Sequence, residues 1–304
     1  MKYYNDIREL IGNTPIVKLN NMNFPQNVNV FAKLELANPG GSVKDRMGMA
    51  VISAAEREGL LKPGSTIVET TAGNAGIGIA LAAIGKGYKI IFTVPLKFSQ
   101  EKQDIMRAYG AQIINTPYED GMQGAFQKAE EIVKSIEGAV CLDQFKNKAN
   151  PAVHYEQTGK EIYEDLEGNI DYLVAGAGSG GTISGAAKYL KEKNKNIKVI
   201  LADPEGSTMA GVGKTGCYKV EGIGNTFVPT TFSRNLIDEV IKTNDKDSFN
   251  EVKLLAANEG ILAGSSSGAA LSAARKTAEK IKNANIAVIL PDRGDRYLSK
   301  KIYE

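Results

Sequence analysis

The chain has 304 residues, longer than most single compact cores, and its 42% hydrophobic and 24% charged residues exclude disordered and fibrous classes. Its 37 basic and 35 acidic residues leave a net charge of +2 without a basic run, and no apolar run approaches the roughly 20 residues that cross a bilayer. Neither nucleic acid nor a membrane is therefore an expected partner.

Two cysteines exclude a disulfide framework, and the N-terminus lacks the apolar core of a signal peptide, so a cytoplasmic protein is expected. With one histidine, a His-rich metal site or a Ser-His-Asp triad is hard to build, so no metal is expected and a cofactor is expected to supply the chemistry.

Short apolar runs alternate with segments of helical period along the chain. The runs at 67–69, 89–94, 112–114, 172–174, 198–201 and 287–290 predict buried strands, and helices are predicted at about 43–58, 77–84 and 183–192. This alternation predicts an α/β fold with a mostly parallel sheet between helices. Ligands of such folds bind in the loops that follow the strands.

The first of these helices carries a candidate catalytic lysine. Ser42 is predicted as its N-cap, with Asp45 completing a capping box, and Gly59 is predicted to end it. Lys44 then lies in the first turn, above an apolar stripe at 47, 48, 51 and 55. A lysine held against a core suits a covalent bond to an aldehyde, and a lysine whose stem packs while its amine reaches water is the alternative.

Two loops rich in glycine and small residues follow predicted strands and precede helices. Each of them, at 70–76 and 175–182, places backbone N–H groups at a helix N-terminus, where an anion is favoured. The second also matches the dinucleotide fingerprint, with Asp203 in the place of a ribose-binding acid, and a tight packing turn is a third interpretation. Two anion sites and a lysine fit a phosphorylated aldehyde that holds an amino-acid carboxylate better than they fit a dinucleotide.

Four motifs occur in order: N-P-G-G-S-V-K-D-R at 38–46, T-A-G-N-A-G at 71–76, G-S-G-G-T at 178–182 and G-S-S-S-G at 264–268. Together they resemble the cysteine synthase and cystathionine β-synthase family, which are fold-type II pyridoxal-phosphate enzymes with a tryptophan synthase β-like fold. The loop at 71–74, the motif D-G-M-Q-G at 120–124 and the tail D-R-Y at 295–297 are most similar to bacterial members that use O-acetylserine to make cystathionine. The resemblance implies two domains, each with a mostly parallel sheet flanked by helices. Residues 1–40 and 146–304 would form the larger, cofactor-phosphate-binding domain, and 41–145 a smaller, mobile substrate-loop domain.

The resemblance also implies roles for individual residues around pyridoxal 5'-phosphate. Lys44 would bond the cofactor covalently and later carry the α-proton, while Asn74 would hydrogen-bond the ring oxygen. Ser266 would meet the pyridine nitrogen as a neutral partner, which favours β-elimination over transamination. The phosphate would be held by Gly178, Ser179, Gly180, Gly181 and Thr182. The substrate would be bound by Thr71, Ala72, Gly73, Asn74, Gln144 and Gly222.

The activity implied is β-replacement on O-acetylserine or serine by a thiol nucleophile, giving cysteine from sulfide or cystathionine from homocysteine, in a homodimer. Ala72 and Ala75 stand where most relatives carry hydroxyl residues, which puts the substrate in doubt and keeps a cysteine β-lyase that releases hydrogen sulfide as the alternative. An NAD-dependent dehydrogenase and a non-catalytic relative are more remote alternatives. His154 is expected at the surface or between domains rather than in catalysis.

Overall fold

The computed structural model describes residues 1, 3–71, 73–96 and 98–304. They form two compact units, a smaller unit of Met1–Ile11 and Lys44–Asn150 and a larger unit of Gly12–Val43 and Pro151–Glu304. The expected boundaries at 40/41 and 145/146 fall a few residues from these, and the first eleven residues group with the smaller unit, not the larger one. Among the described residues, no helix is both long and apolar enough to span a membrane.

The described part of the larger unit contains a six-stranded sheet in the order β1-β2-β9-β6-β7-β8. Only β1 runs antiparallel to its neighbour, and the other pairs are parallel. The strands are β1 (Ile16–Lys18), β2 (Val28–Leu34), β6 (Tyr172–Gly176), β7 (Lys198–Pro204), β8 (Glu239–Thr243) and β9 (Ala284–Leu290). The helices are η2 (Glu35–Ala37), the π-helical η3 (His154–Gly159), α6 (Lys160–Asp165), α7 (Gly181–Lys193), η4 (Arg234–Leu236), α8 (Asp245–Glu259), α9 (Ser265–Ala278) and η5 (Asp295–Lys300), and α5 (Ala149–Val153) spans the junction of the units.

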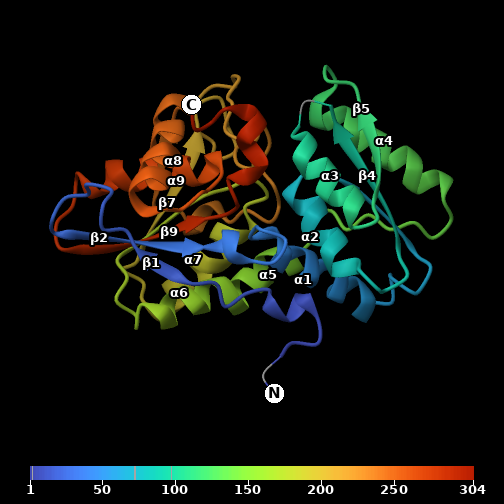
Figure 1. Ribbon diagram of the computed structural model, residues 1–304, viewed down its shortest axis with the longest axis horizontal. Coiled ribbons are helices and arrows are strands. Elements are labelled where there is room, and N and C mark those ends of the chain that lie inside the picture. The colour runs from blue at the N-terminus through green and yellow to red at the C-terminus, as the bar shows by residue number, and fades with distance from the viewer. Residues whose placement is uncertain (2, 72, 97) are drawn as a thin grey trace. The chain divides into compact units, whose positions relative to one another are not determined.

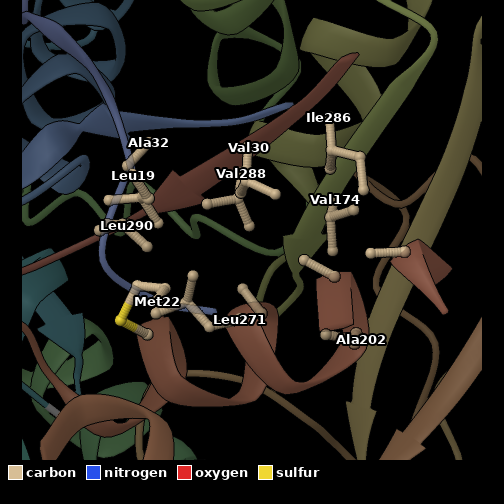
Figure 2. Close-up of a cluster of buried hydrophobic side chains, with 14 of the residues drawn as sticks. Leu19, Met22, Val30, Ala32, Val174, Ala202, Leu271, Ile286, Val288 and Leu290 are labelled. Carbon is tan, nitrogen blue, oxygen red and sulfur yellow. The ribbon is translucent and has the colours of Figure 1, made fainter. Parts of the chain in front are cut away.

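Both faces of this sheet are covered by helices. Alternate residues of a strand point to opposite faces, so Ile286, Val288 and Leu290 of β9 pack with α8 and α9. Figure 2 shows this cluster, in which Val174 and Leu271 also take part. Ala287 and Ile289 point the other way, into a cluster with α6 and α7. Burial on both faces explains why the central strands read as continuous apolar runs.

The described part of the smaller unit contains a three-stranded parallel sheet in the order β3-β4-β5 (Figure 1). Its strands are β3 (Thr66–Thr70), β4 (Lys89–Pro95) and β5 (Gln112–Thr116), and its helices are η1 (Ile7–Leu10), α1 (Lys44–Arg57), α2 (Asn74–Ala83), α3 (Gln100–Ala108) and α4 (Gly121–Ser135). Helices α1, α2 and α3 share one apolar cluster with β3 and β4. Helix α4 is joined to the sheet by the hydroxyls of Thr70 and Thr93, which both donate to the Ala125 carbonyl.

All six predicted strands and three predicted helices are present, and the two-domain α/β fold with mostly parallel sheets is confirmed. The predicted N-cap is wrong by one residue, because α1 begins at Lys44 while Ser42 forms an isolated bridge with Asp292. Gly59 does follow the end of α1, with a φ of +72°. Lys44 therefore occupies the first position of its helix.

Candidate active site

Lys44 is placed by a close contact between α1 and α2. A Cβ atom at Gly78 of α2 would lie 2.2 Å from the carbonyl oxygen of Lys44, and one at Gly48 of α1 would lie 2.2 Å from the carbonyl oxygen of Gly78. Only glycine allows two backbones to approach this closely. The predicted stripe below Lys44 is buried, with Met47 and Val51 both 0% exposed, whereas Lys44 itself is partly exposed.

The loop after β3 is folded around the side chain of Thr71. The Thr71 hydroxyl oxygen accepts hydrogen bonds from the N–H of Gly73 at 2.9 Å and of Gly76 at 3.1 Å. Because the oxygen is the acceptor in both bonds, the hydroxyl hydrogen takes no part in them and can be donated to another acceptor. The loop leads into Asn74, the first and partly exposed residue of α2, so this helix begins three residues before the predicted start at 77. The expected substrate contact Ala72 lies outside the described residues.

Ala75 points into the apolar cluster of the smaller unit and is 5% exposed. A hydroxyl group at this position would face that cluster and would need a hydrogen-bond partner there. The packing of α2 therefore gives a physical reason for alanine at 75.

Gln144 is held at the carboxyl end of β3 by a buried carboxylate. One oxygen of Glu69 accepts hydrogen bonds from the N–H of Leu142 at 3.1 Å and of Asp143 at 2.9 Å. The carbonyl of Gln144 accepts in turn from the side-chain amide of Asn150 at 2.8 Å. Burial raises the pKa of Glu69 to about 7, against the lowering effect of these N–H groups. Gln144 thus lies at the same strand end as the Thr71 loop.

The loop after β6 is held from outside by a neighbouring segment. The carbonyl oxygens of residues 177–179 accept hydrogen bonds from the Gly224 N–H at 2.8 Å, the Asn225 side-chain amide at 2.6 Å and the Thr231 hydroxyl at 2.5 Å. Gly180 caps α7 with a φ of +82°. The first N–H groups of a helix have no acceptor inside it, so they and the helix dipole favour an anion at this loop.

Gly178, Gly222 and Ser266 come together in the larger unit. A Cβ at Gly178 would lie 2.5 Å from the carbonyl oxygen of Gly222, and a Cβ at Gly222 would lie 4.0 Å from the Ser266 hydroxyl oxygen. Ser266 is the second residue of α9 and is 3% exposed. The adjacent Ser265 hydroxyl accepts a hydrogen bond from the Glu221 N–H at 3.0 Å. Residues 221–224 therefore link the glycine loop to the N-terminus of α9.

The tail motif fixes that same N-terminus. Gly264, the N-cap of α9, donates its N–H to the Asp292 carbonyl at 3.0 Å, and a Cβ on it would lie 2.1 Å from the Asp292 carboxylate. The Tyr297 hydroxyl donates to the Asp292 carboxylate at 2.5 Å, and complete burial raises its pKa well above its usual range. The tail motif at 295–297 thus has a structural role: it helps to hold the N-terminus of α9, the helix that carries Ser266.

Three buried polar residues near these loops were not assigned to the site by sequence reasoning: Glu69, Lys102 and His154. Lys102 of α3 is 2% exposed, and its Cδ would lie 2.3 Å from a Cβ at Gly73, whose φ is +139°. His154 does not lie at the surface, one of the two places expected for it, because it is 0% exposed and its ring contacts Thr182. Their contacts with Leu142, Gly73 and Thr182, respectively, join residues distant in sequence, so no local pattern marks these contacts.

The family model for "Pyridoxal-phosphate dependent enzyme" matches residues 7–292. The chain belongs to this family. It is 51% identical over 305 residues to the O-acetylserine dependent cystathionine beta-synthase of Bacillus subtilis, covering 100% of this chain and 99% of the relative. It is 44% identical over 304 residues to a cysteine synthase of Staphylococcus aureus, covering 99% and 98%. A solved hydrogen sulfide-producing enzyme of Fusobacterium nucleatum superposes with a TM-score of 0.94 at 38% identity, covering 97% and 100%.

The larger unit fits the phosphate and ring nitrogen of pyridoxal phosphate. Its glycine loop lies at a helix N-terminus, and at Gly178 a Cβ would collide with the neighbouring loop. Ser266, whose hydroxyl oxygen would lie 4.0 Å from a Cβ at Gly222, offers a neutral hydroxyl. The dinucleotide alternative fails, because Asp203 is 1% exposed and bonds the Lys242 ammonium at 2.6 Å, so it does not present a carboxylate to a ribose.

Proposed function

We propose that this enzyme exchanges the β-substituent of O-acetylserine for the sulfur of a thiol. The C–O bond to acetate breaks, a C–S bond to the thiol forms, and the thiol proton leaves with acetate. Pyridoxal phosphate, when bound, supplies an electron sink for the charge that develops at the α-carbon. The observation that carries the proposal is the glycine loop of α7 beside Ser266, because a neutral hydroxyl at the ring nitrogen favours elimination and replacement over transamination.

The chain's own residues would divide the remaining work between binding and proton transfer. Lys44 would bond the cofactor and carry the α-proton, and Asn74 would orient the ring oxygen. The loop from Gly178 to Thr182 would bind the phosphate through N–H and hydroxyl donors. The substrate carboxylate would be bound by the Thr71 hydroxyl, the Gly73 backbone and the Gln144 amide, with Ala72 and Gly222 lining the substrate.

We propose homocysteine as the thiol and cystathionine as the product. The full-length identity of 51% to the Bacillus subtilis enzyme supports this choice over cysteine synthesis from sulfide. A cysteine β-lyase that releases hydrogen sulfide remains the second candidate, and the similarity to the Fusobacterium nucleatum enzyme favours it. The homodimer and the cytoplasmic location expected from the sequence stay predictions.

The test is a visible absorption scan of the purified protein before and after addition of O-acetylserine, followed by sulfide or homocysteine in separate samples. We expect a yellow protein whose band shifts with O-acetylserine and returns with homocysteine at lower concentration than with sulfide. A band that responds to cysteine and not to O-acetylserine would favour the β-lyase. Lys44→Ala should lose the band of the covalently bound cofactor, and a variant that keeps it would contradict the assignment of Lys44.

A further inference from the structure

His154 lies between two hydroxyl groups inside the larger unit. Its Nδ1 is 2.9 Å from the Thr158 hydroxyl oxygen, and its Nε2 is 3.2 Å from the Thr182 hydroxyl oxygen. The three side chains are buried, and His154 is 0% exposed. Thr182 is the second residue of α7 and the last residue of the proposed phosphate loop. The imidazole therefore contacts the loop from the side of the protein interior.

The ring is held in place by close packing of α7 on the segment that carries His154. A Cβ at Gly185 of α7 would lie 2.2 Å from the Pro151 carbonyl oxygen and 2.8 Å from the His154 Cβ. A Cβ at Gly159 would lie 2.9 Å from the Ala186 Cα. His154 also begins the π-helix η3, a geometry that is rare and is frequent at functional sites. These contacts fix the distance from the ring to Thr182.

The position of the ring hydrogen decides what Thr182 can offer an anion. If Nδ1 carries the hydrogen, Nε2 accepts from the Thr182 hydroxyl, and only oxygen lone pairs remain to face the loop. If Nε2 carries it, His154 donates to the Thr182 oxygen, and the hydroxyl hydrogen can be donated to a phosphate. Thr158 then satisfies Nδ1 by donating its own hydroxyl hydrogen. Only the second arrangement agrees with an anion at the N-terminus of α7.

We propose that His154 is a positioning residue that donates from Nε2 to Thr182 and thereby makes the Thr182 hydroxyl a donor to the cofactor phosphate. This proposal rests on the proposed function, because it takes residues 178–182 as the phosphate loop. It assigns to the one histidine of the chain a role in cofactor binding without contact to the cofactor itself.

Nitrogen-15 NMR of the full-length holoenzyme labelled in histidine tests the proposal directly. Because the chain has a single histidine, its two ring-nitrogen resonances need no assignment by mutation. We expect Nε2 at the shift of a protonated nitrogen. The Nδ1 resonance should move in Thr158→Val and stay in Thr158→Ser. An Nε2 resonance at the shift of an unprotonated nitrogen would overturn the proposal.

Variants of His154 give a second readout through the affinity for the cofactor. His154→Gln can keep a side-chain N–H donor near the position of Nε2, whereas His154→Asn is too short to reach Thr182. His154→Asn removes the donor that orients the Thr182 hydroxyl, so the hydrogen bond from Thr182 to the charged phosphate should be lost. Such a bond is worth about 1.5 to 3 kcal/mol, so binding of pyridoxal phosphate should weaken about ten- to hundredfold, with pyridoxal binding unchanged. His154→Gln should stay within about threefold of wild type. The phosphorus-31 shift of the bound phosphate should move in His154→Asn and not in His154→Gln.

The outcomes separate this proposal from the proposed function. A wild-type chain that binds no pyridoxal phosphate would overturn both. A wild-type chain that binds it, together with a folded His154→Asn that binds it equally well and with an unchanged phosphorus-31 shift, would overturn the role of His154 alone. Equal loss of affinity in the Gln and Asn variants would also overturn it, because the effect would then be one of packing.

Discussion

The contact between α1 and α2 predicts that Gly78→Ala impairs catalysis much more than it impairs folding. The added Cβ would lie 2.2 Å from the Lys44 carbonyl oxygen, so the two helices must separate by about 1 Å to reach ordinary contact distance. Overpacking of this kind costs about 1 to 3 kcal/mol, and the better helix propensity of alanine offsets about 1 kcal/mol of it. We expect a net loss of at most about 2 kcal/mol in the free energy of unfolding.

The rate should respond more strongly, because Lys44 is the first residue of the displaced helix. A misplacement of about 1 Å at a reacting group can cost about a hundredfold in rate. The assay pairs urea denaturation with the rate of β-replacement on O-acetylserine, and Gly48→Ala should behave in the same way.

Gly85→Ala is the matched control. Gly85 has a φ of +74°, and a Cβ added there would meet no atom within 4 Å, so alanine costs about 1 to 2 kcal/mol of backbone strain without moving Lys44. Its rate should stay at the wild-type value. A wild-type rate in Gly78→Ala at similar loss of stability would refute the argument that this contact positions the lysine.

Three further predictions concern the stability of the units and the phosphate loop. In the folded protein the pKa of Glu69 is raised to about 7 from 4.5, so stabilisation that is fully present below pH 4.5 is lost as the pH rises through 7, by up to about 3 kcal/mol. Glu69→Gln should flatten this dependence of the free energy of unfolding on pH, measured by urea titration at several pH values. Equal pH dependence in wild type and variant would contradict the prediction. Gly180→Ala places a Cβ 2.5 Å from that of Phe232 at a φ of +82°, and should weaken pyridoxal phosphate binding at least about tenfold in equilibrium dialysis. Tyr297→Phe removes a hydrogen bond to the buried Asp292 carboxylate and should lower the free energy of unfolding by about 1.5 to 3 kcal/mol, whereas an unchanged urea midpoint would show that this bond is dispensable.

Five of the six predicted strands are largely buried and read as apolar runs, whereas β5 is only partly buried. The missed strands are β1, β8 and β2. The first two lie at the sheet edges, where a strand has one neighbour and carries polar residues such as Glu239 and Lys242. In β2 the apolar pattern is broken by Lys33, which is 0% exposed and pairs with Glu161 at 2.9 Å. A partner so distant in sequence leaves no local signal.

The site was predictable to the extent that it depends on local motifs. A lysine at the start of α1 and glycine loops at the starts of α2 and α7 follow from strand, turn and helix signals in the chain. The supporting contacts do not, because Gly222 meets Gly178 only through the packing of two loops and His154 meets Thr182 across 28 residues. Ala75 shows the same limit, since its substitution is explained by the cluster it packs in and not by its neighbours in sequence.

The register of β2 on β9, from Val28 with Ala284 to Leu34 with Leu290, has a consequence for biosynthesis. Strand β2 can pair with β1 as soon as both are made, but its other edge must wait unpaired until the ribosome has reached β9, near residue 290. The sheet of the smaller unit needs only residues 66–140, so it can form while the larger unit is still incomplete. The contacts that hold the N-terminus of α9, and with it Ser266, form only after the tail at 292–297 has been made. Cofactor capture would therefore report the last step of maturation, and truncated or stalled chains should remain colourless.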